Sequence, residues 1–238
     1  MDASKRWPVW PKAVGRPLDP TLQSLKDVLD GLAVLHEDPF IRDVRDTILR
    51  FPDANVGVAL NKKQTACKKW AVEELCRAGV GRLETVHVLA GWYGLLGAML
   101  LNEPRLGIAH LTVVDVNPDC EPVALSLNAT PAAEGRFAFR QHDILALDYA
   151  APPPGLDRPD LIVNTSCEHL ADFSDWFAGL PSGQLVLLQS NDYRAIPEHV
   201  NCVDSLAAFQ EQAPLADPLY AGELRLDKYT RFMLIGRK

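Results

Sequence analysis

A glycine-rich break between an apolar run and a helix-forming run constrains this chain more than any other feature. Residues 86–97 read Val-His-Val-Leu-Ala-Gly-Trp-Tyr-Gly-Leu-Leu-Gly and include Gly91, Gly94 and Gly97. A second apolar run, about twenty residues later, ends at Asp115. In a nucleotide-binding βαβ unit, glycines let the backbone approach the ligand, and an acid after the second strand accepts hydrogen bonds from the ribose hydroxyls. The pattern therefore predicts an adenosine-containing ligand; its alternative is close packing of a helix on a strand.

Apolar runs alternate with helical patterns from residue 85 onward. We expect parallel strands at 85–90, 110–115, 136–141, 159–164 and 184–190, with helices between them at 95–103, 118–127 and 172–179. Two further strand-like runs, Leu219–Leu226 and Tyr229–Arg237, flank a tight turn. The predicted fold class is α/β: a Rossmann-like, doubly wound sheet with an antiparallel C-terminal hairpin. Alternating apolar and charged residues at 136–140 place the third strand at an edge of the sheet.

Residues 1–80 lack this alternation and are predicted to be helical. Apolar spacing predicts helices at Thr21–Leu35, Pro39–Phe51 and Gln64–Ala78. In the first helix, the residues expected to face inward are Leu22, Leu25, Val28, Leu29, Leu32 and Leu35. The segment Trp7–Pro11 before it is expected to be extended. We therefore divide the chain into an N-terminal helical cap, 1–80, and a ligand-binding domain, 81–238; the cap either packs on that domain or forms a lid over its ligand.

Composition and charge exclude several classes of function. The chain has 47% hydrophobic and 23% charged residues and a net charge of -7, which suits a globular protein and opposes binding to a nucleic acid. The dense basic stretch, Lys62-Lys63 with Lys68-Lys69, is expected to be a solvated helix face. No apolar run is long enough to span a bilayer and the first residues form no signal region, so we expect a cytoplasmic protein without a membrane partner.

The spacing of cysteines and histidines predicts no metal site. The five cysteines include no Cys-x-x-Cys pair, and an odd number indicates free thiols. Histidines are scattered, at His87, His142, His169 and His199, and no His-Glu-x-x-His occurs. Glu198-His199 lies in the approach to the hairpin and is interpreted as structural.

Polar residues follow the predicted third, fourth and fifth strands. Gln141–Ile144 follows the third strand, where Asp143 can face the edge of an adenine and Ile144 can cover its ring. Asn164–His169 follows the fourth strand, and Gln189–Tyr193 follows the fifth. Ligands of open α/β sheets lie beyond the carboxyl ends of the strands. These segments are therefore expected to meet the glycine loop in one crevice.

Residues 85–237 resemble the fold of the class I S-adenosylmethionine (SAM)-dependent methyltransferases. The matching positions are Gly91-Trp92-Tyr93-Gly94 as the loop on the methionine side, Asp115 as the ribose acid and Asp143 as the residue at the adenine edge. The terminal hairpin matches the reversed last strand of that fold. The chain departs from the pattern at His87-Val88-Leu89-Ala90, where an acid is usual. The resemblance implies a SAM-binding Rossmann-like domain in which Asn117 and Ile144 also bind the cofactor.

Three segments more narrowly resemble the bacterial azetidine-2-carboxylate synthases. They are Asn61-Lys62-Lys63-Gln64 before Trp70, the segment 164–169 and the segment 189–193. The resemblance implies that SAM is the substrate and is cyclised by attack of its α-amine on Cγ, giving azetidine-2-carboxylate and 5′-methylthioadenosine without a metal. A SAM-dependent small-molecule methyltransferase and a non-catalytic adenosyl-ligand sensor stay open as alternatives. The sequence also leaves a homodimer open.

The cyclisation assigns hypothetical roles to residues after the fourth and fifth strands. Asn164 and Ser166 are expected to orient the α-amine, and Glu168 or His169 to accept its proton. Alternatively, Glu168 and His169 are a helix-start acid and a packed imidazole. Tyr193 and Asn191 either line the reactive end of the site or belong to a turn.

Two further groups are assigned to the methionine part of the ligand. Asn61, Lys62 and Gln64 are expected to clamp the substrate carboxylate from the cap. Trp92 and Tyr93 are expected to face the sulfonium through cation–π contact, which is worth about 1–2 kcal/mol when the cation is desolvated.

Overall fold

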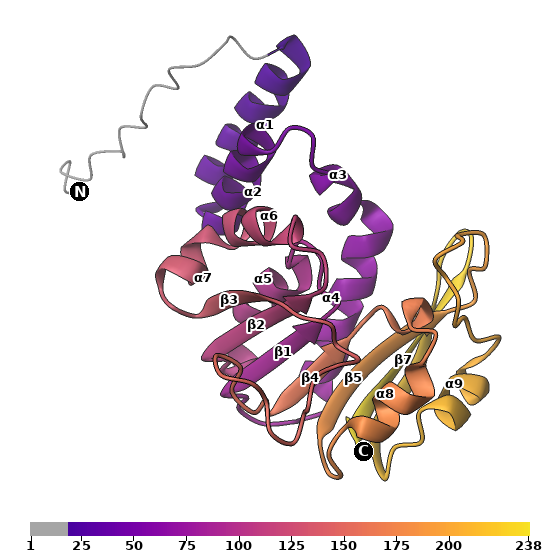
Figure 1. Ribbon diagram of the computed structural model, residues 1–238. Helices are drawn as coiled ribbons and strands as arrows, with labels where there is room; N and C mark the ends of the chain where they lie inside the picture. Colours follow the sequence, from indigo (N-terminus) through magenta and orange to yellow (C-terminus); the bar gives the residue numbers. More distant parts are fainter. Residues whose placement is uncertain (1–18) are drawn as a thin grey trace.

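One mixed sheet forms the centre of the molecule (Figure 1). The computed structural model describes residues 19–238, so the segment Trp7–Pro11 lies outside them. The sheet has seven strands in the order β3-β2-β1-β4-β5-β7-β6. The strands are β1 (Thr85–Leu89), β2 (His110–Asp115), β3 (Phe137–Gln141), β4 (Leu161–Asn164), β5 (Leu185–Asn191), β6 (Asp217–Arg225) and β7 (Thr230–Arg237).

The direction of the strands confirms the expected doubly wound sheet with a terminal hairpin. Strands β1 to β5 pair in parallel, whereas β7 is antiparallel to both β5 and β6. The expected edge position of β3 is confirmed. Because β7 runs backward, its first residues lie at the carboxyl ends of the parallel strands, and Arg231 is paired in register with Asn191.

Helices cover both faces of the sheet, as the burial of parallel strands requires. On one face, α4 (Lys62–Arg77), α5 (Leu95–Leu101) and α6 (Cys120–Leu127) share a core with β1 and β2. On the other face, α8 (Phe173–Gly179) and α9 (Leu206–Gln212) pack around Phe173 and Phe209. The remaining short elements are α3 (Val56–Ala59), α7 (Ala129–Ala133) and 3-10 turns at Pro104–Leu106 and Cys167–His169.

The expected helices all occur, whereas the sequence pattern missed α3, α7 and α9. Of these, α3 and α7 have only four and five residues, which is too short for a helical period to show. Within residues 19–238, no helix combines the length and the hydropathy that crossing a membrane would need.

The first two helices pack on the outside of the α6–α7 region. They are α1 (Pro20–His36) and α2 (Pro39–Arg50). Thr47 Oγ1 on α2 donates to Ser126 Oγ at 2.9 Å, and Asp43 Oδ2 accepts the Thr130 backbone N–H at 2.9 Å. No residue of α1 is buried. The expectation of an inward apolar face on α1 is wrong for four of its residues, because they lie on the part of the helix that α2 does not cover: Leu25, Val28, Leu32 and Leu35 are exposed.

Helix α4 belongs to the main core and carries its N-terminal end to the functional region. Ala71, Val72 and Leu75 are buried against the sheet. Asn61 caps the helix, because its Oδ1 accepts the backbone N–H groups of Lys63 and Gln64, both at 3.0 Å. Part of the segment 1–80 therefore shares the core of the remaining chain, and the boundary at residue 80 stays a prediction.

His87 on β1 should make the fold sensitive to acid. Its side chain is buried, Nε2 has no partner among the described residues, and burial lowers its pKa to about 4. Since the unfolded imidazole titrates near 6.5, the unfolded state binds the proton first and stability is lost as the pH falls from there toward 4. In His87→Leu, about 2 kcal/mol of the loss in unfolding free energy between about pH 7 and about pH 4.5 should disappear. Guanidinium unfolding at about pH 7 and about pH 4.5 measures it, with exposed His110→Leu as the control; an undiminished acid loss in His87→Leu would contradict the account.

Candidate functional site

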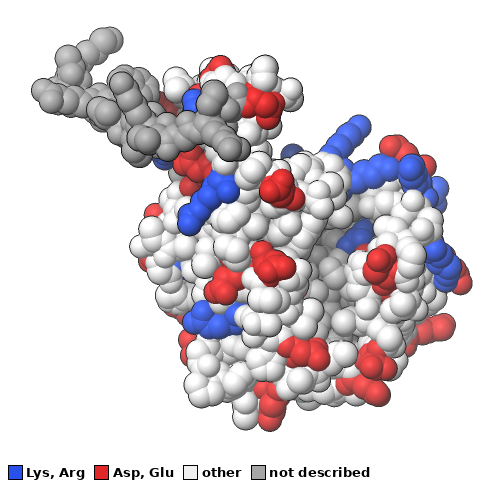
Figure 2. All heavy atoms as spheres, turned by 45° about the horizontal axis from the view of Figure 1, so that its top comes forward, with Lys and Arg blue, Asp and Glu red and all other residues white. Residues whose placement is uncertain are grey.

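A cavity of about 650 Å³ opens at the carboxyl ends of the parallel strands. Its wall is formed by the loops after β1, β2, β4 and β5, the start of β7, and the segment that joins α3 to α4. Figure 2 shows the hollow, with Lys or Arg atoms inside it and along its rim. This is the edge of the sheet at which ligands bind in open α/β folds.

Most of the predicted site residues meet in this cavity. Those that line it are Asn61, Gln64, Gly91, Trp92, Tyr93, Asp115, Asn117, Ser166, Glu168, His169 and Tyr193. Four predicted residues are not among its lining: Gly94, Asp143, Ile144 and Asn164. The surroundings of these four residues explain why each of them does not line the cavity.

Gly94 and Asn164 shape the loops that carry the site. Gly94 has a φ of 72° and precedes α5, and a Cβ at this position would lie 2.9 Å from Asn128 Nδ2. A side chain is therefore excluded by both conformation and packing. The Asn164 side chain is fully buried, and its Oδ1 accepts the Ser166 N–H at 2.9 Å. Asn164 therefore positions the loop after β4, and its expected part in orienting the α-amine stays a prediction.

Asp143 and Ile144 lie next to the cavity without lining it. Ile144 is buried in the core with α8, and Asp143 Oδ1 accepts the Leu145 N–H at 2.9 Å. The backbone N–H of His142 donates to the Asp115 carbonyl at 3.0 Å, which holds this turn beside the end of β2. Their contact with an adenine stays a prediction.

Asp115 connects the loop after β1 to the end of β2. Its Oδ2 accepts the Trp92 N–H at 2.8 Å, and its Oδ1 accepts the Asn117 N–H at 3.0 Å. Trp92 has a φ of 50°, in the left-handed region that a bulky side chain avoids. Strain of this kind persists where the surroundings impose it, often at functional sites. The hydrogen bond from Trp92 to Asp115 therefore sets the shape of the loop.

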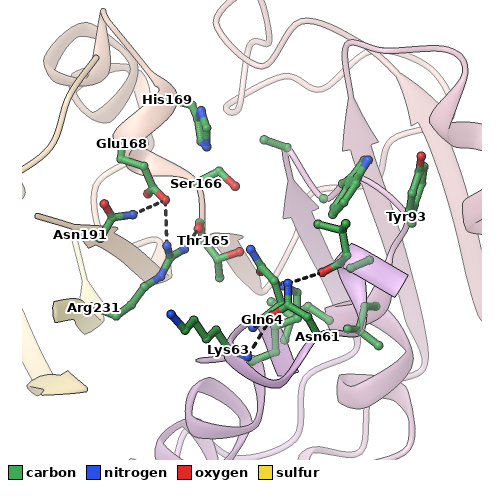
Figure 3. A pocket seen from close by; sticks show the side chains of 18 of the residues that line it. Asn61, Lys63, Gln64, Tyr93, Thr165, Ser166, Glu168, His169, Asn191 and Arg231 are labelled. Atoms are coloured by element: carbon green, nitrogen blue, oxygen red, sulfur yellow. Dashed lines mark hydrogen bonds and ion pairs between the residues drawn. The ribbon is translucent and has the colours of Figure 1, made fainter. Parts of the chain in front are cut away.

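The loop also places two aromatic rings at the cavity. Trp92 and Tyr93 are stacked with ring centroids 4.5 Å apart and planes at 24°. Figure 3 shows Tyr93 on one side of the cavity, and Glu168 and His169 on the other. A cation bound between these walls would face both an aromatic surface and a set of polar groups.

Glu168 and Arg231 form a buried ion pair at the polar end of the cavity. Glu168 Oε1 accepts hydrogen bonds from Arg231 Nη1 at 2.8 Å and from Asn191 Nδ2 at 2.6 Å (Figure 3). Arg231 also donates from Nε to Gln189 Oε1 at 3.2 Å and from Nη2 to the Thr165 carbonyl. Glu168 and Arg231 are only 2% and 8% exposed, so the pair is rigidly held. Sequence reasoning missed Arg231, although a charge inside an apolar strand was its signal.

Lysines of α4 point into the cavity rather than only into solvent. Lys63 and Lys68 line it, whereas Lys62 and Lys69 are exposed. The interpretation of this stretch as a wholly solvated face is therefore wrong. Burial, and then the nearby Arg231, lowers the pKa of Lys68 to about 8. Lys68 Nζ donates to Gln64 Oε1 at 2.6 Å.

His199, which was interpreted from the sequence as structural, also lines the cavity. Its ring meets that of His169 edge to face, with centroids 4.6 Å apart. The histidines that look scattered in the sequence are therefore partly gathered. Residues 192–205 have no regular period, so nothing in the sequence indicated that they fold back over the site.

Comparisons with known proteins identify the class of fold. No family model and no curated protein sequence matches the chain. Among solved structures, the N-methyltransferase NodS from Bradyrhizobium japonicum in complex with S-adenosylhomocysteine is 15% identical, covering 84% of this chain and 96% of that one with a TM-score of 0.56. The [4+2]-cyclase SpnF is 11% identical, covering 76% and 83%, with a TM-score of 0.57. An O-methyltransferase family protein from Burkholderia thailandensis is 20% identical, covering 91% and 70%, with a TM-score of 0.51.

These likenesses and the strand order define one class of fold. The chain has the Rossmann-like α/β fold of the class I SAM-dependent methyltransferases. At these identities the likeness establishes the fold, and the activity must be argued from the site.

Proposed function

We propose that the chain cyclises SAM to azetidine-2-carboxylate and 5′-methylthioadenosine. The adenosine is proposed to lie beside Asp115, and the sulfonium beside the stacked rings of Trp92 and Tyr93. The methionine part then extends toward the polar end of the same cavity, which Glu168 and Arg231 line. An S-adenosylhomocysteine complex of NodS supports an adenosyl ligand for this fold.

The observation that best supports the cyclisation is the lowered pKa of an amine that already lines the cavity. Lys68 is a primary amine, and burial together with Arg231 lowers its pKa from 10.5 to about 8. A free α-amine titrates at about 7.7–8.0. Burial in the same cavity would shift the pKa of a substrate α-amine in the same direction, which favours the neutral form that attack on Cγ requires. A methyl donor has no need of a neutral amine, whereas a self-cyclising substrate requires one.

The cyclisation requires no second substrate. The α-ammonium releases one proton, its lone pair forms the N–Cγ bond, and the Cγ–S bond breaks with its electrons moving to sulfur. The rate enhancement then comes from holding the amine behind Cγ, in line with the breaking bond, and from excluding water. SpnF is described as a [4+2]-cyclase, which supports the idea that this fold can host ring formation as well as methyl transfer.

The test is incubation of the purified chain with SAM alone, followed by mass spectrometry of the products. We expect methylthioadenosine and azetidine-2-carboxylate in equal amounts. Homoserine or its lactone would show that oxygen rather than nitrogen attacks, and would refute the proposal. Tight binding without turnover would favour a methyltransferase that awaits its acceptor, or a sensor.

A further inference from the structure

Three side chains at the polar end of the cavity converge from two segments. Glu168 and His169 belong to the 3-10 turn after β4, and His199 lies in the segment after β5. One carboxylate oxygen of Glu168 and one nitrogen of each imidazole all lie within 4.8 Å of one another. The two rings meet at 89°. All three residues line the cavity, so a ligand can reach the cluster.

Backbone carbonyls fix the tautomer of both imidazoles. His169 Nδ1 lies 3.1 Å from the Glu198 carbonyl, and His199 Nδ1 lies 2.6 Å from the Tyr193 carbonyl. Since a carbonyl oxygen can only accept, each Nδ1 carries the proton. In a neutral imidazole, Nε2 then has a free lone pair and is an acceptor.

The carboxylate supplies a third acceptor. Glu168 Oε1 already accepts from Asn191 and Arg231. Its Oε2 is buried and has no hydrogen-bond partner within residues 19–238. A buried carboxylate oxygen without a donor costs free energy, so the site is incomplete until a ligand brings N–H or O–H groups.

Charge and spacing select the kind of ligand. Arg231 already balances the charge of Glu168, and Lys68 lines the same cavity. A divalent cation would add two positive charges beside these groups, whereas an amine brings N–H donors and can be neutral. Acceptors placed at about 2.9 Å around one tetrahedral nitrogen lie about 4.7 Å apart, and Glu168, His169 and His199 each bring one ligand atom within 4.8 Å of the other two.

We propose that Glu168, His169 and His199 form the acceptor site for the α-amine of the adenosyl ligand. The three acceptors bind the α-ammonium, and one of them receives the proton that it releases. Rotation about the Cα–N bond then turns the freed lone pair from that acceptor toward Cγ, which it attacks. The proton then passes to solvent, and sulfur keeps the electron pair of the broken Cγ–S bond. The inference rests on the proposed function for the last step only, since recognition of the amine requires no turnover.

The test is calorimetric titration of the full chain with two ligands that cannot be cyclised. S-Adenosylhomocysteine has the α-amine but no sulfonium, and methylthioadenosine lacks the amino-acid part. In His199→Ala, we expect affinity for S-adenosylhomocysteine to fall about tenfold, with affinity for methylthioadenosine unchanged. His199→Gln, which restores an acceptor, should recover part of the loss and serves if the alanine variant does not fold. His110→Ala is the matched control, because His110 Nδ1 also meets a backbone carbonyl but the residue lies at the start of β2.

Two outcomes would overturn the amine site. One is an equal loss of affinity for both ligands in His199→Ala, which would show a structural role. The other is binding of S-adenosylhomocysteine by the original chain that depends on added Zn²⁺ and is abolished by a chelator, which would assign the cluster to a metal. If selective loss is found while SAM is not cyclised, the amine site stands and the proposed function fails.

Discussion

Asp115→Ala is expected to weaken the binding of S-adenosylhomocysteine about 100-fold. The carboxylate is proposed to hold both ribose hydroxyls, and bonds to a charged group contribute about 1.5–3 kcal/mol each. The substitution also removes the acceptor of the Trp92 N–H, which holds the loop after β1 in its strained shape. Affinity for methylthioadenosine should fall equally, because both ligands share the ribose.

Calorimetric titration measures this effect, and Asp119→Ala is its matched control. Asp119 lies four residues later, is exposed and makes no side-chain cap of α6. Its replacement should leave both affinities unchanged. Unaltered affinity of the Asp115→Ala variant would show that the nucleoside does not lie at the end of β2, and the placement of the ligand would be wrong.

Arg231→Leu is expected to abolish turnover of SAM and to lower the free energy of unfolding by about 3 kcal/mol. The substitution leaves the Glu168 charge buried without its counter-ion, and loss of one partner of such a pair costs about 3–5 kcal/mol. It also removes the guanidinium group that we propose lowers the pKa of the substrate amine. Guanidinium unfolding and the SAM product assay measure the two effects separately.

A double variant distinguishes the ion pair's contribution to stability from its contribution to chemistry. Arg231→Leu with Glu168→Leu removes both charges, and should recover much of the stability while turnover stays absent. The exposed pair Arg225–Glu223 provides a control, since its loss should change neither quantity. Turnover by the double variant at the original rate would contradict the role of the pair in the site.

The sheet and the site residues that follow β1 and β2 were predicted from the sequence, because both depend on local patterns. Apolar runs bounded by glycine and polar residues mark β1 and β2, and the acid after β2 follows from its position alone. The reversed hairpin was also local, since two strand-like runs flank the turn at Asp227-Lys228. The predicted cap helices were found, although the inward face assigned to α1 was not.

The partners of Glu168 and His169 at the polar end of the site could not be predicted, because they depend on contacts between distant segments. Arg231 reaches Glu168 across 63 residues of sequence, and this pairing requires knowing that β7 lies beside β5 in reverse. The His199 ring contacts the His169 ring, but His199 lies in a segment that has no regular hydrophobic period. Lys68 shares its helix with solvated lysines, and only the position of α4 on the sheet shows which of them face the cavity. Periodicity also could not show that the Asn164 side chain, at the end of a strand, is fully buried.

An NMR experiment shows directly which bond to sulfur breaks. SAM labelled with ¹³C at the methyl group is incubated with the purified chain and followed by NMR. We expect the labelled methyl group to stay on sulfur. Its signal should shift from that of the sulfonium methyl to that of the thioether methyl of methylthioadenosine, at the same rate as azetidine ring signals appear. A label that leaves sulfur for an acceptor, with formation of S-adenosylhomocysteine, would show methyl transfer and would contradict the cyclisation.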